Sequence, residues 1–288
     1  MSRGLGDVYK RQVVHGVLDG QGVVEVVGPH DAEHRTECFG PVLGVVRADD
    51  LDHALAIQNA VDYGLTGGLH ALDEAEIEHW LARVEVGNVY VNRHTTGAVV
   101  RRQPFGGWKR SSIGRGAKTG GPGDVARFVR WSRPGPAPAP GEVERSYRRW
   151  WQERFGVEID RTGLRAEANV LRYRPVAGVL VRAGPGTPPA DVASLRLAAA
   201  VAGVPIEVAG PERGDVDVAV RLAGRGPVPI ERLRLLAPAG EGVRRAAHAA
   251  GVTVDETPVT HDGRVELPCW LREQAISRTR HRHGRIPS

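Results

Sequence analysis

A short proline-rich segment constrains the folding of this chain more than any other feature. Proline occupies every second position from Pro134 to Pro140. Because proline lacks a backbone N–H and fixes φ, such a run fits neither a helix interior nor a central strand and favours extended polyproline geometry. We therefore predict a semi-rigid linker over 133–142, with a structured region on either side.

The region before the linker, 13–132, alternates strand-like and helix-like segments. Three segments rich in apolar and β-branched residues are expected to be strands: 42–47, 65–72 and 87–92. Helical spacing of apolar residues predicts helices over 49–59, capped by Asp49 or Asp50, and over 73–84. The second helix is expected to bury one face, made of Ile77, Trp80, Leu81 and Val84. This alternation predicts an α/β sheet.

The region after the linker, 143–288, shows a second alternation of the same kind. Three helices are expected, over 143–155, 191–202 and 241–250. Four strands are expected, over 176–182, 206–209, 233–236 and 252–254, with a further element over 216–222. The order predicts a small Rossmann-like unit, so the expected fold class of the whole chain is α/β.

Size and composition exclude several classes of protein. A chain of 288 residues is long enough for about two domains of roughly 150 residues each. No apolar run approaches the ~18–20 residues that span a bilayer, and no apolar signal segment begins the chain. Two cysteines, Cys38 and Cys269, cannot form a disulfide framework. A cytoplasmic protein without a membrane span is therefore expected.

The basic charge does not by itself indicate nucleic-acid binding. The formal net charge is +5 and the pI is near 9.6, but arginines are spread along the chain among acids. We therefore expect no nucleic-acid partner. The arginine-rich segment 278–285 leaves one alternative open, and that alternative predicts DNA affinity falling steeply with salt.

Two further patterns are expected to be structural. Gly184-Pro-Gly186 follows a predicted strand. The next residues are Thr-Pro-Pro and do not continue a dinucleotide-binding fingerprint, so a strand-to-helix turn is expected. Several candidate metal ligands have spacings that match no zinc pattern: His261, Cys269, His281 and His283. We expect no metal site there, only a basic, solvated tail. Cys38 is expected to be a small buried residue.

Three motifs are more specific because they occur in order. The first is E-C-F-G-P at 37–41, and the second is Y-G-L-T-G-G at 63–68, preceded by Asn59. The third begins with G-N-V-Y-V-N at 87–92 and continues through T-G-A-V-V at 96–100 and Q-P-F-G-G at 103–107 to G-A-K-T-G-G-P at 116–122.

Together these motifs resemble the C-terminal part of the aldehyde dehydrogenase catalytic domain. More narrowly, they resemble the L-glutamate-γ-semialdehyde (Δ1-pyrroline-5-carboxylate) dehydrogenases, as found in bacterial bifunctional proline-utilisation flavoenzymes. The motifs at 164–175 and 271–282 are similar to the C-terminal extension of the long flavoenzymes. The resemblance implies that 143–288 is an aldehyde-dehydrogenase-like domain that covers the substrate channel and binds no cofactor.

The resemblance also assigns binding residues. Glu37 would accept hydrogen bonds from the nicotinamide ribose of NAD, and Phe39 would pack near the nicotinamide. Backbone N–H groups of Gly97 and Ala98 would bind the substrate α-carboxylate, which points to L-glutamate γ-semialdehyde as the small-molecule substrate. Phe105 would lie in the wall of the site, with Gly106 and Gly107 as structural turns.

In the family, the catalytic residues lie before the E-x-F-G-P motif. The thiolate nucleophile, the general base and the nucleotide domain all precede it, so no catalytic residue is expected in this chain and no dehydrogenase activity from it alone. FAD would belong only to a further upstream domain, and the parent enzyme is expected to be a homo-oligomer. Residues 1–12 resemble the read-through of a sequencing adapter and are expected to be a non-native leader. The alternative is a non-catalytic lid or oligomerisation module.

Overall fold

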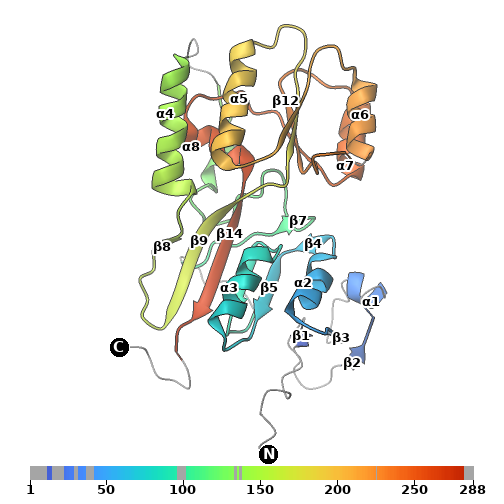
Figure 1. Ribbon diagram of the computed structural model, residues 1–288, viewed down its shortest axis with the longest axis vertical. Helices are drawn as coiled ribbons and strands as arrows, with labels where there is room; N and C mark the ends of the chain where they lie inside the picture. Colours follow the sequence, from blue (N-terminus) through green and yellow to red (C-terminus); the bar gives the residue numbers. More distant parts are fainter. Residues whose placement is uncertain are drawn as a thin grey trace, which may run out of the picture. The chain divides into compact units, whose positions relative to one another are not determined.

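The protein divides into two compact units, each built from separate stretches of sequence (Figure 1). The computed structural model describes residues 12–14, 23–28, 32–36, 42–95, 102–132, 135, 138–224 and 226–281. The first unit comprises Met1–Ser111, Thr162–Asn169 and Ala275–Ser288, and the second comprises Ser112–Arg161 and Val170–Gln274. Two of the boundaries therefore fall within strands, β9 (Glu167–Pro175) and β14 (Leu271–Thr279).

The first unit begins with a small sheet. Its three strands are β1 (Gln12–Val14), β2 (Val23–Val26) and β3 (Val42–Arg47), in the order β1-β3-β2. Strand β3 runs parallel to β2 and antiparallel to β1, and α1 (Ala32–Arg35) lies between β2 and β3 in the sequence. A small apolar cluster of Val27, Val46 and Ile57 is buried in this part of the unit.

Two helices of the first unit form where their caps and apolar faces predict them. Helix α2 (Leu51–Asn59) begins after Asp50, whose side chain accepts the N–H of His53 at 2.8 Å. Helix α3 (Glu74–Arg83) begins after Asp73, which accepts the N–H of Ala75. The predicted apolar face is buried, and it consists of Ile77, Trp80, Leu81 and Val84.

The main sheet of the first unit is parallel at its centre. Strand β6 (Asn88–Val91), buried at all four residues, pairs in parallel with β5 (Thr66–Leu69) on one side. On its other side it pairs in parallel with the end of β14, where Ala275 lies opposite Asn88. A two-stranded antiparallel ribbon joins β4 (Tyr63–Gly64) to β7 (Trp108–Lys109).

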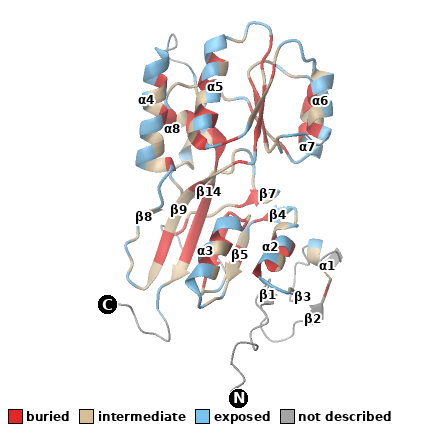
Figure 2. Cartoon of the chain, in the orientation of Figure 1, coloured by how far each residue is buried: buried red, intermediate tan, exposed pale blue. Residues whose placement is uncertain are grey.

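The second unit contains a four-stranded parallel sheet of the predicted Rossmann-like kind. Its strands are β10 (Val179–Arg182), β11 (Ile206–Ala209), β12 (Arg232–Leu235) and β13 (Thr253–Asp255), in the order β11-β10-β12-β13. Helix α5 (Pro189–Ala202) shares an apolar cluster with Val179 and Val181. Leu180, between them, shares a second cluster with α6 (Asp215–Ala223) and α7 (Glu241–Ala249). The sheet is therefore covered on both faces, as the buried residues in Figure 2 show.

The remaining elements of the second unit are short, apart from α4. Helix α4 (Pro140–Trp150) continues into a π-helical turn, Trp151–Phe155. The second unit also contains two 3₁₀ turns, Val125–Phe128 and Leu267–Trp270, and the short helix α8 (Gly263–Glu266). Strand β8 (Ile159–Asp160) pairs antiparallel with β9. Within the described ranges, no helix is both long and apolar enough to cross a membrane.

The α/β fold class is confirmed, and two local expectations are corrected. The element over 216–222, whose type the sequence left open, is helix α6, and the strand expected from 176 begins at Val179. Residues 271–279 form β14, a largely buried strand, instead of a solvated tail. Buried polar residues conceal this strand in the sequence, because Gln274 and Ser277 interrupt the apolar pattern but are bonded to Arg172 and Asn169.

Candidate functional site

Most of the predicted binding residues lie outside the described residues. These are Glu37, Phe39, Gly97 and Ala98, and the same is true of Cys38. Phe105 is described and is half-buried. The described part of the candidate site therefore consists of the residues that hold Phe105 and of those that flank 96–101 in the sequence.

Asn88 fixes the Q-P-F-G-G segment on both sides of Phe105. Asn88 is the fully buried first residue of β6. Its Nδ2 donates to the carbonyl oxygen of Pro104 at 3.1 Å, and its Oδ1 accepts the N–H of Gly106 at 3.0 Å. Because the amide of Asn88 both donates to and accepts from the same loop, it fixes the backbone of that loop without adding a charge. Phe105 is therefore held between two anchored neighbours.

The end of this segment requires glycine. A Cβ on Gly107 would lie 2.4 Å from both the Cβ and the carbonyl oxygen of Ser111. No real Cβ contact is that short, so a larger residue would push the turn open. This geometry gives Gly107 a structural role, the one expected from the sequence.

A partly buried ion network joins Glu167 to residues on both sides of the segment 96–101. Glu167 lies on β9, and its side chain is only 15% exposed. Arg93 Nη1 donates to Glu167 Oε2 at 2.9 Å, and Arg102 Nη1 donates to Oε1 at 2.8 Å. Arg93 also donates to Ser277 Oγ, which in turn donates to Asn169 Oδ1 at 2.8 Å. One carboxylate thus holds the residues that precede and follow Gly97 and Ala98 in the chain.

The sequence alone indicated no role for Glu167 or Asn88, although Asn88 lies in the motif at 87–92 and Glu167 in the motif at 164–175. The available signal was the spacing of Glu167 and Asn169, two polar residues on one face of a strand. Such a pair on a buried face requires partners, which the two arginines and Ser277 supply.

The glycine turn after β10 is filled by the protein itself. A Cβ on Gly184 would lie 2.5 Å from the Cβ of Ala237, and the N–H of Gly184 donates to Thr187 Oγ1 at 2.9 Å. Beside it, Arg182 pairs with Asp215 at 2.6 Å. A dinucleotide site needs an open backbone at this position. The turn has the geometry of a strand-to-helix connection, with α5 beginning at Pro189.

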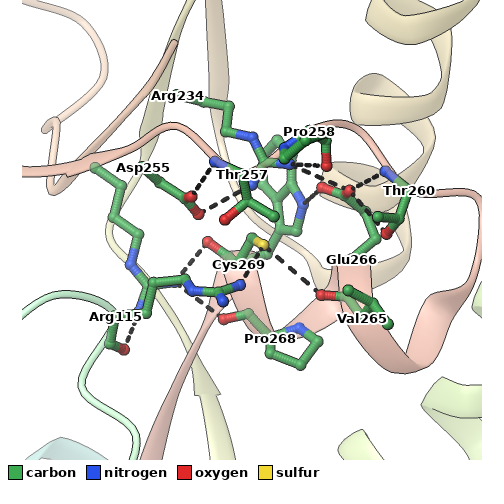
Figure 3. Close-up of polar contacts among 12 residues, drawn as sticks. Arg115, Arg234, Asp255, Thr257, Pro258, Thr260, Val265, Glu266, Pro268 and Cys269 are labelled. Atoms are coloured by element: carbon green, nitrogen blue, oxygen red, sulfur yellow. Dashed lines mark hydrogen bonds and ion pairs between the residues drawn. The ribbon is translucent and has the colours of Figure 1, made fainter. Parts of the chain in front are cut away.

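The second unit holds a cluster of buried charges (Figure 3). Arg234 of β12 pairs with Asp255 at 2.9 Å and with Glu266 at 3.3 Å, and all three side chains are at most 5% exposed. Glu266 also accepts the N–H of Thr260 at 2.9 Å and the indole N–H of Trp270 at 3.2 Å. Burial raises the pKa of Asp255, but the charges of Arg234 and Arg115 outweigh this and hold it below its usual range.

Cys269 lies inside this cluster as a neutral thiol. Arg115 Nη1 donates to its Sγ at 3.0 Å, and the thiol faces the carbonyl oxygen of Val265 at 3.8 Å (Figure 3). Burial raises the pKa of Cys269 to about 11, although Arg234 opposes the shift. A thiol of this kind is a poor nucleophile at neutral pH. Arg232 completes the packing by donating to the carbonyl oxygens of Arg115, Pro268 and Leu271.

Lys118 and Glu273 are two further buried titratable residues, joined by a backbone hydrogen bond. The backbone N–H of Lys118 donates to Glu273 Oε2 at 2.8 Å, and both side chains are buried. Burial lowers the pKa of Lys118 to about 7, against the attraction of Glu273. Burial also raises the pKa of Glu273. In the part of the chain that the structure describes, no group of three or more histidine, cysteine or acidic side chains could hold a metal ion.

Comparison with known proteins agrees with the motifs. Residues 6–131 match the Aldehyde dehydrogenase family. The chain is 41% identical over 138 residues to the bifunctional protein PutA of Rhizobium meliloti, and 48% identical over 92 residues to the 1-pyrroline-5-carboxylate dehydrogenase of Bacillus cytotoxicus. These alignments cover 47% and 32% of this chain, but only 11% and 18% of those proteins.

A solved structure resembles nearly the whole chain. It is proline utilization A (PutA) from Corynebacterium freiburgense, with a TM-score of 0.75 and 39% identity over 91% of this chain and 28% of that one. The chain therefore spans well under a third of the length of these relatives. The likeness extends across both sides of the proline-rich segment.

Proposed function

We propose that this chain, which contains an aldehyde dehydrogenase family domain, is the substrate- and nicotinamide-facing part of an NAD-dependent L-glutamate-γ-semialdehyde dehydrogenase with its covering domain. The observation that carries the proposal is the likeness to a PutA structure over 91% of the chain at 39% identity. The reaction would oxidise L-glutamate γ-semialdehyde to L-glutamate in proline catabolism, in the cytoplasm, with the parent enzyme a homo-oligomer.

Substrate selection would depend on the segment between Arg93 and Arg102. Backbone N–H groups of Gly97 and Ala98 would bind the substrate α-carboxylate, and Phe105 would form part of the wall. The Glu167 bridges to Arg93 and Arg102 support this role, because they restrain the chain on both sides of that segment. Less backbone entropy is then lost when the carboxylate binds.

NAD would be held by the first unit, not by the Rossmann-like sheet. At the described turn, the N–H of Gly184 donates to Thr187 Oγ1, so this group is already used within the protein and is not open to a phosphate. Glu37 and Phe39 would hold the nicotinamide ribose and ring, and the cofactor would supply a hydride acceptor. FAD would belong to another part of a bifunctional parent.

The chain alone would have no dehydrogenase activity. The reaction needs a thiolate nucleophile and a general base. Cys269 is buried as a neutral thiol, and Cys38 stands within the motif assigned to NAD. The alternative, a non-catalytic lid or oligomerisation module, is favoured by one observation: Val125 and Phe128 are apolar and at least three-quarters exposed.

The test uses the full chain and a pair of ligands that differ in one group. L-glutamate carries the α-carboxylate, and 4-aminobutyrate lacks it. We expect L-glutamate to raise the unfolding temperature and 4-aminobutyrate to leave it unchanged. Ala98→Pro, which removes one N–H donor, should abolish the shift, whereas Ala177→Pro in the second unit should retain it, provided both variants fold. Equal shifts with both ligands would contradict the proposed substrate role. NAD reduction by the unaltered chain would contradict its inactivity.

A further inference from the structure

The second unit contains a large cavity that has no part in the function proposed above. Its volume is about 1100 Å³, and it lies between the segment 113–131, the turn that ends α4, and residues 254–273. All the described residues that line it belong to the second unit. None of the residues assigned to NAD or to the semialdehyde is among them.

Three arginine–aromatic pairs form much of the cavity wall. The guanidinium carbons lie 5.0 Å from the ring centre for Arg127 over Phe128, 5.8 Å for Arg264 over Trp150 and 6.0 Å for Arg154 over Phe155. All six of these residues line the cavity. A guanidinium packed on a ring keeps its N–H edge available for an anion while the ring offers a flat apolar face.

The acidic residues of the cavity are already engaged. Asp255 pairs with Arg234, and Glu256 pairs with Arg244. Glu273 accepts the N–H of Lys118, and Asp262 accepts the N–H of Arg264 as the cap of α8.

Three cavity arginines have no close ion pair among the described residues, although the charge of Arg154 acts on Glu273 and its side chain bonds that of Tyr173. No carboxylate among the described residues lies within 4 Å of the guanidinium groups of Arg154, Arg161 or Arg264. Such groups match the oxygens of a phosphate or carboxylate, which they can bind through two parallel N–H groups.

Apolar surface lies beside these charges. Ile113 is 96% exposed and Phe128 is 77% exposed, and both line the cavity. Trp131 and Trp150 line it as well, and their indole N–H groups are buried without a described hydrogen-bond partner. Large exposed apolar side chains next to unpaired arginines are typical of a site for a ligand with both characters.

We infer that this cavity binds an organic polyanion with a planar ring system, the chemistry of a nucleoside phosphate. The ring packs against the aromatic wall around Phe128 and Trp131. The phosphates bind Arg154, Arg161 and Arg264. The volume accommodates a nucleotide, since ligand cavities are commonly about 300–1,000 Å³.

The experiment titrates the full chain with ATP, adenosine and inorganic tripolyphosphate, by calorimetry and by quenching of tryptophan fluorescence. Because the site contacts both the ring and the phosphates, ATP should bind at least about tenfold more tightly than either adenosine or tripolyphosphate. Phe128→Ala should weaken ATP binding and leave tripolyphosphate binding unchanged. Tripolyphosphate binding as tight as that of ATP would overturn the inference, as would no ATP binding at about 1 mM.

Charge reversal locates the site. Arg161→Glu and Arg264→Glu alter exposed side chains of the cavity and should each weaken ATP binding by about tenfold or more. Arg196→Glu makes the same charge change on an exposed position of α5 outside the cavity and should leave the affinity for ATP unchanged. If Arg196→Glu weakens binding as much as the cavity variants, the attraction is one of overall charge and the inference fails. Thermal unfolding of each variant checks its folding.

Discussion

The two units satisfy their buried polar groups by different means. In the first unit, the amide of Asn88 bonds to the backbone and keeps a loop in place without a charge. In the second unit, Arg234 forms buried ion pairs with Asp255 and Glu266. An amide clamp can be lost one hydrogen bond at a time, whereas removing one member of a charge cluster leaves the others uncompensated. The second unit should therefore be the more sensitive to single substitutions.

The largest effect is expected from Glu266→Gln. The substitution keeps the shape but leaves Arg234 with one carboxylate instead of two, and we expect a loss of about 3 kcal/mol in the free energy of unfolding. Urea denaturation measures it. Glu256→Gln breaks the exposed pair with Arg244 and serves as the control, with an unchanged denaturation midpoint expected. Equal effects from the two variants would remove the distinction between the units.

Asn88→Ala should have the next largest effect. It removes the hydrogen bonds that Asn88 makes to the carbonyl of Pro104 and to the N–H of Gly106, at a cost of about 2 kcal/mol. Hydrogen exchange should become faster at the Gly106 amide. Asn59→Ala is the matched control, because Asn59 also bonds one carbonyl and one N–H, those of Arg83 and Glu85. Unchanged exchange at Gly106 in Asn88→Ala would mean that the loop is held by other contacts.

Glu167→Gln tests the ionic network that Glu167 forms with Arg93 and Arg102 in the first unit. It weakens the bridges to Arg93 and Arg102, and because Arg102 is partly exposed we expect a loss of only about 1 kcal/mol. The loss should shrink in high salt, which screens exposed charges. A loss as large as that from Glu266→Gln would show that both units depend equally on buried charge.

The last prediction concerns the slope of stability with pH. Burial holds the pKa of Lys118 at about 7, below its value in the unfolded chain, so the unfolded state binds more protons between about pH 7 and 10.5. Stability should therefore rise with pH in this window, by about 1 kcal/mol per pH unit. Lys118→Met removes this slope, and denaturation midpoints at pH 7 and 8.5 measure it. If the stability of Lys118→Met rises more steeply with pH than that of the wild type, the assigned direction of the Lys118 pKa shift is wrong.

Local signals predicted the fold well where side-chain pattern and capping agree. Asp50, Asp73 and the face formed by Ile77 and Trp80 locate α2 and α3 closely, because a helix depends on neighbours within a few residues. Strand β14 escaped prediction because its buried polar residue Gln274 finds a partner far away in the sequence. Burial that depends on distant partners leaves no periodic pattern.

The candidate site was predictable only as a set of motifs. The order of the motifs is enough to indicate the family, and residues 6–131 match the Aldehyde dehydrogenase family. The clamp by Asn88 and the bridge from Glu167 could not be foreseen, because each joins segments whose pairing is decided by the sheet. The arginine–aromatic cavity combines residues from 113 to 273 in the same way.

The parallel pairing of β14 with β6 has a consequence for synthesis on the ribosome. Residues 275–278 complete the sheet next to 88–91, yet they emerge long after them. Until then β6 presents an open edge, the kind of edge that invites wrong partners. The contact order of this sheet is high, so its completion should be slow. The first unit, although it contains the earlier sequence, is expected to finish folding last and to need chaperones during translation.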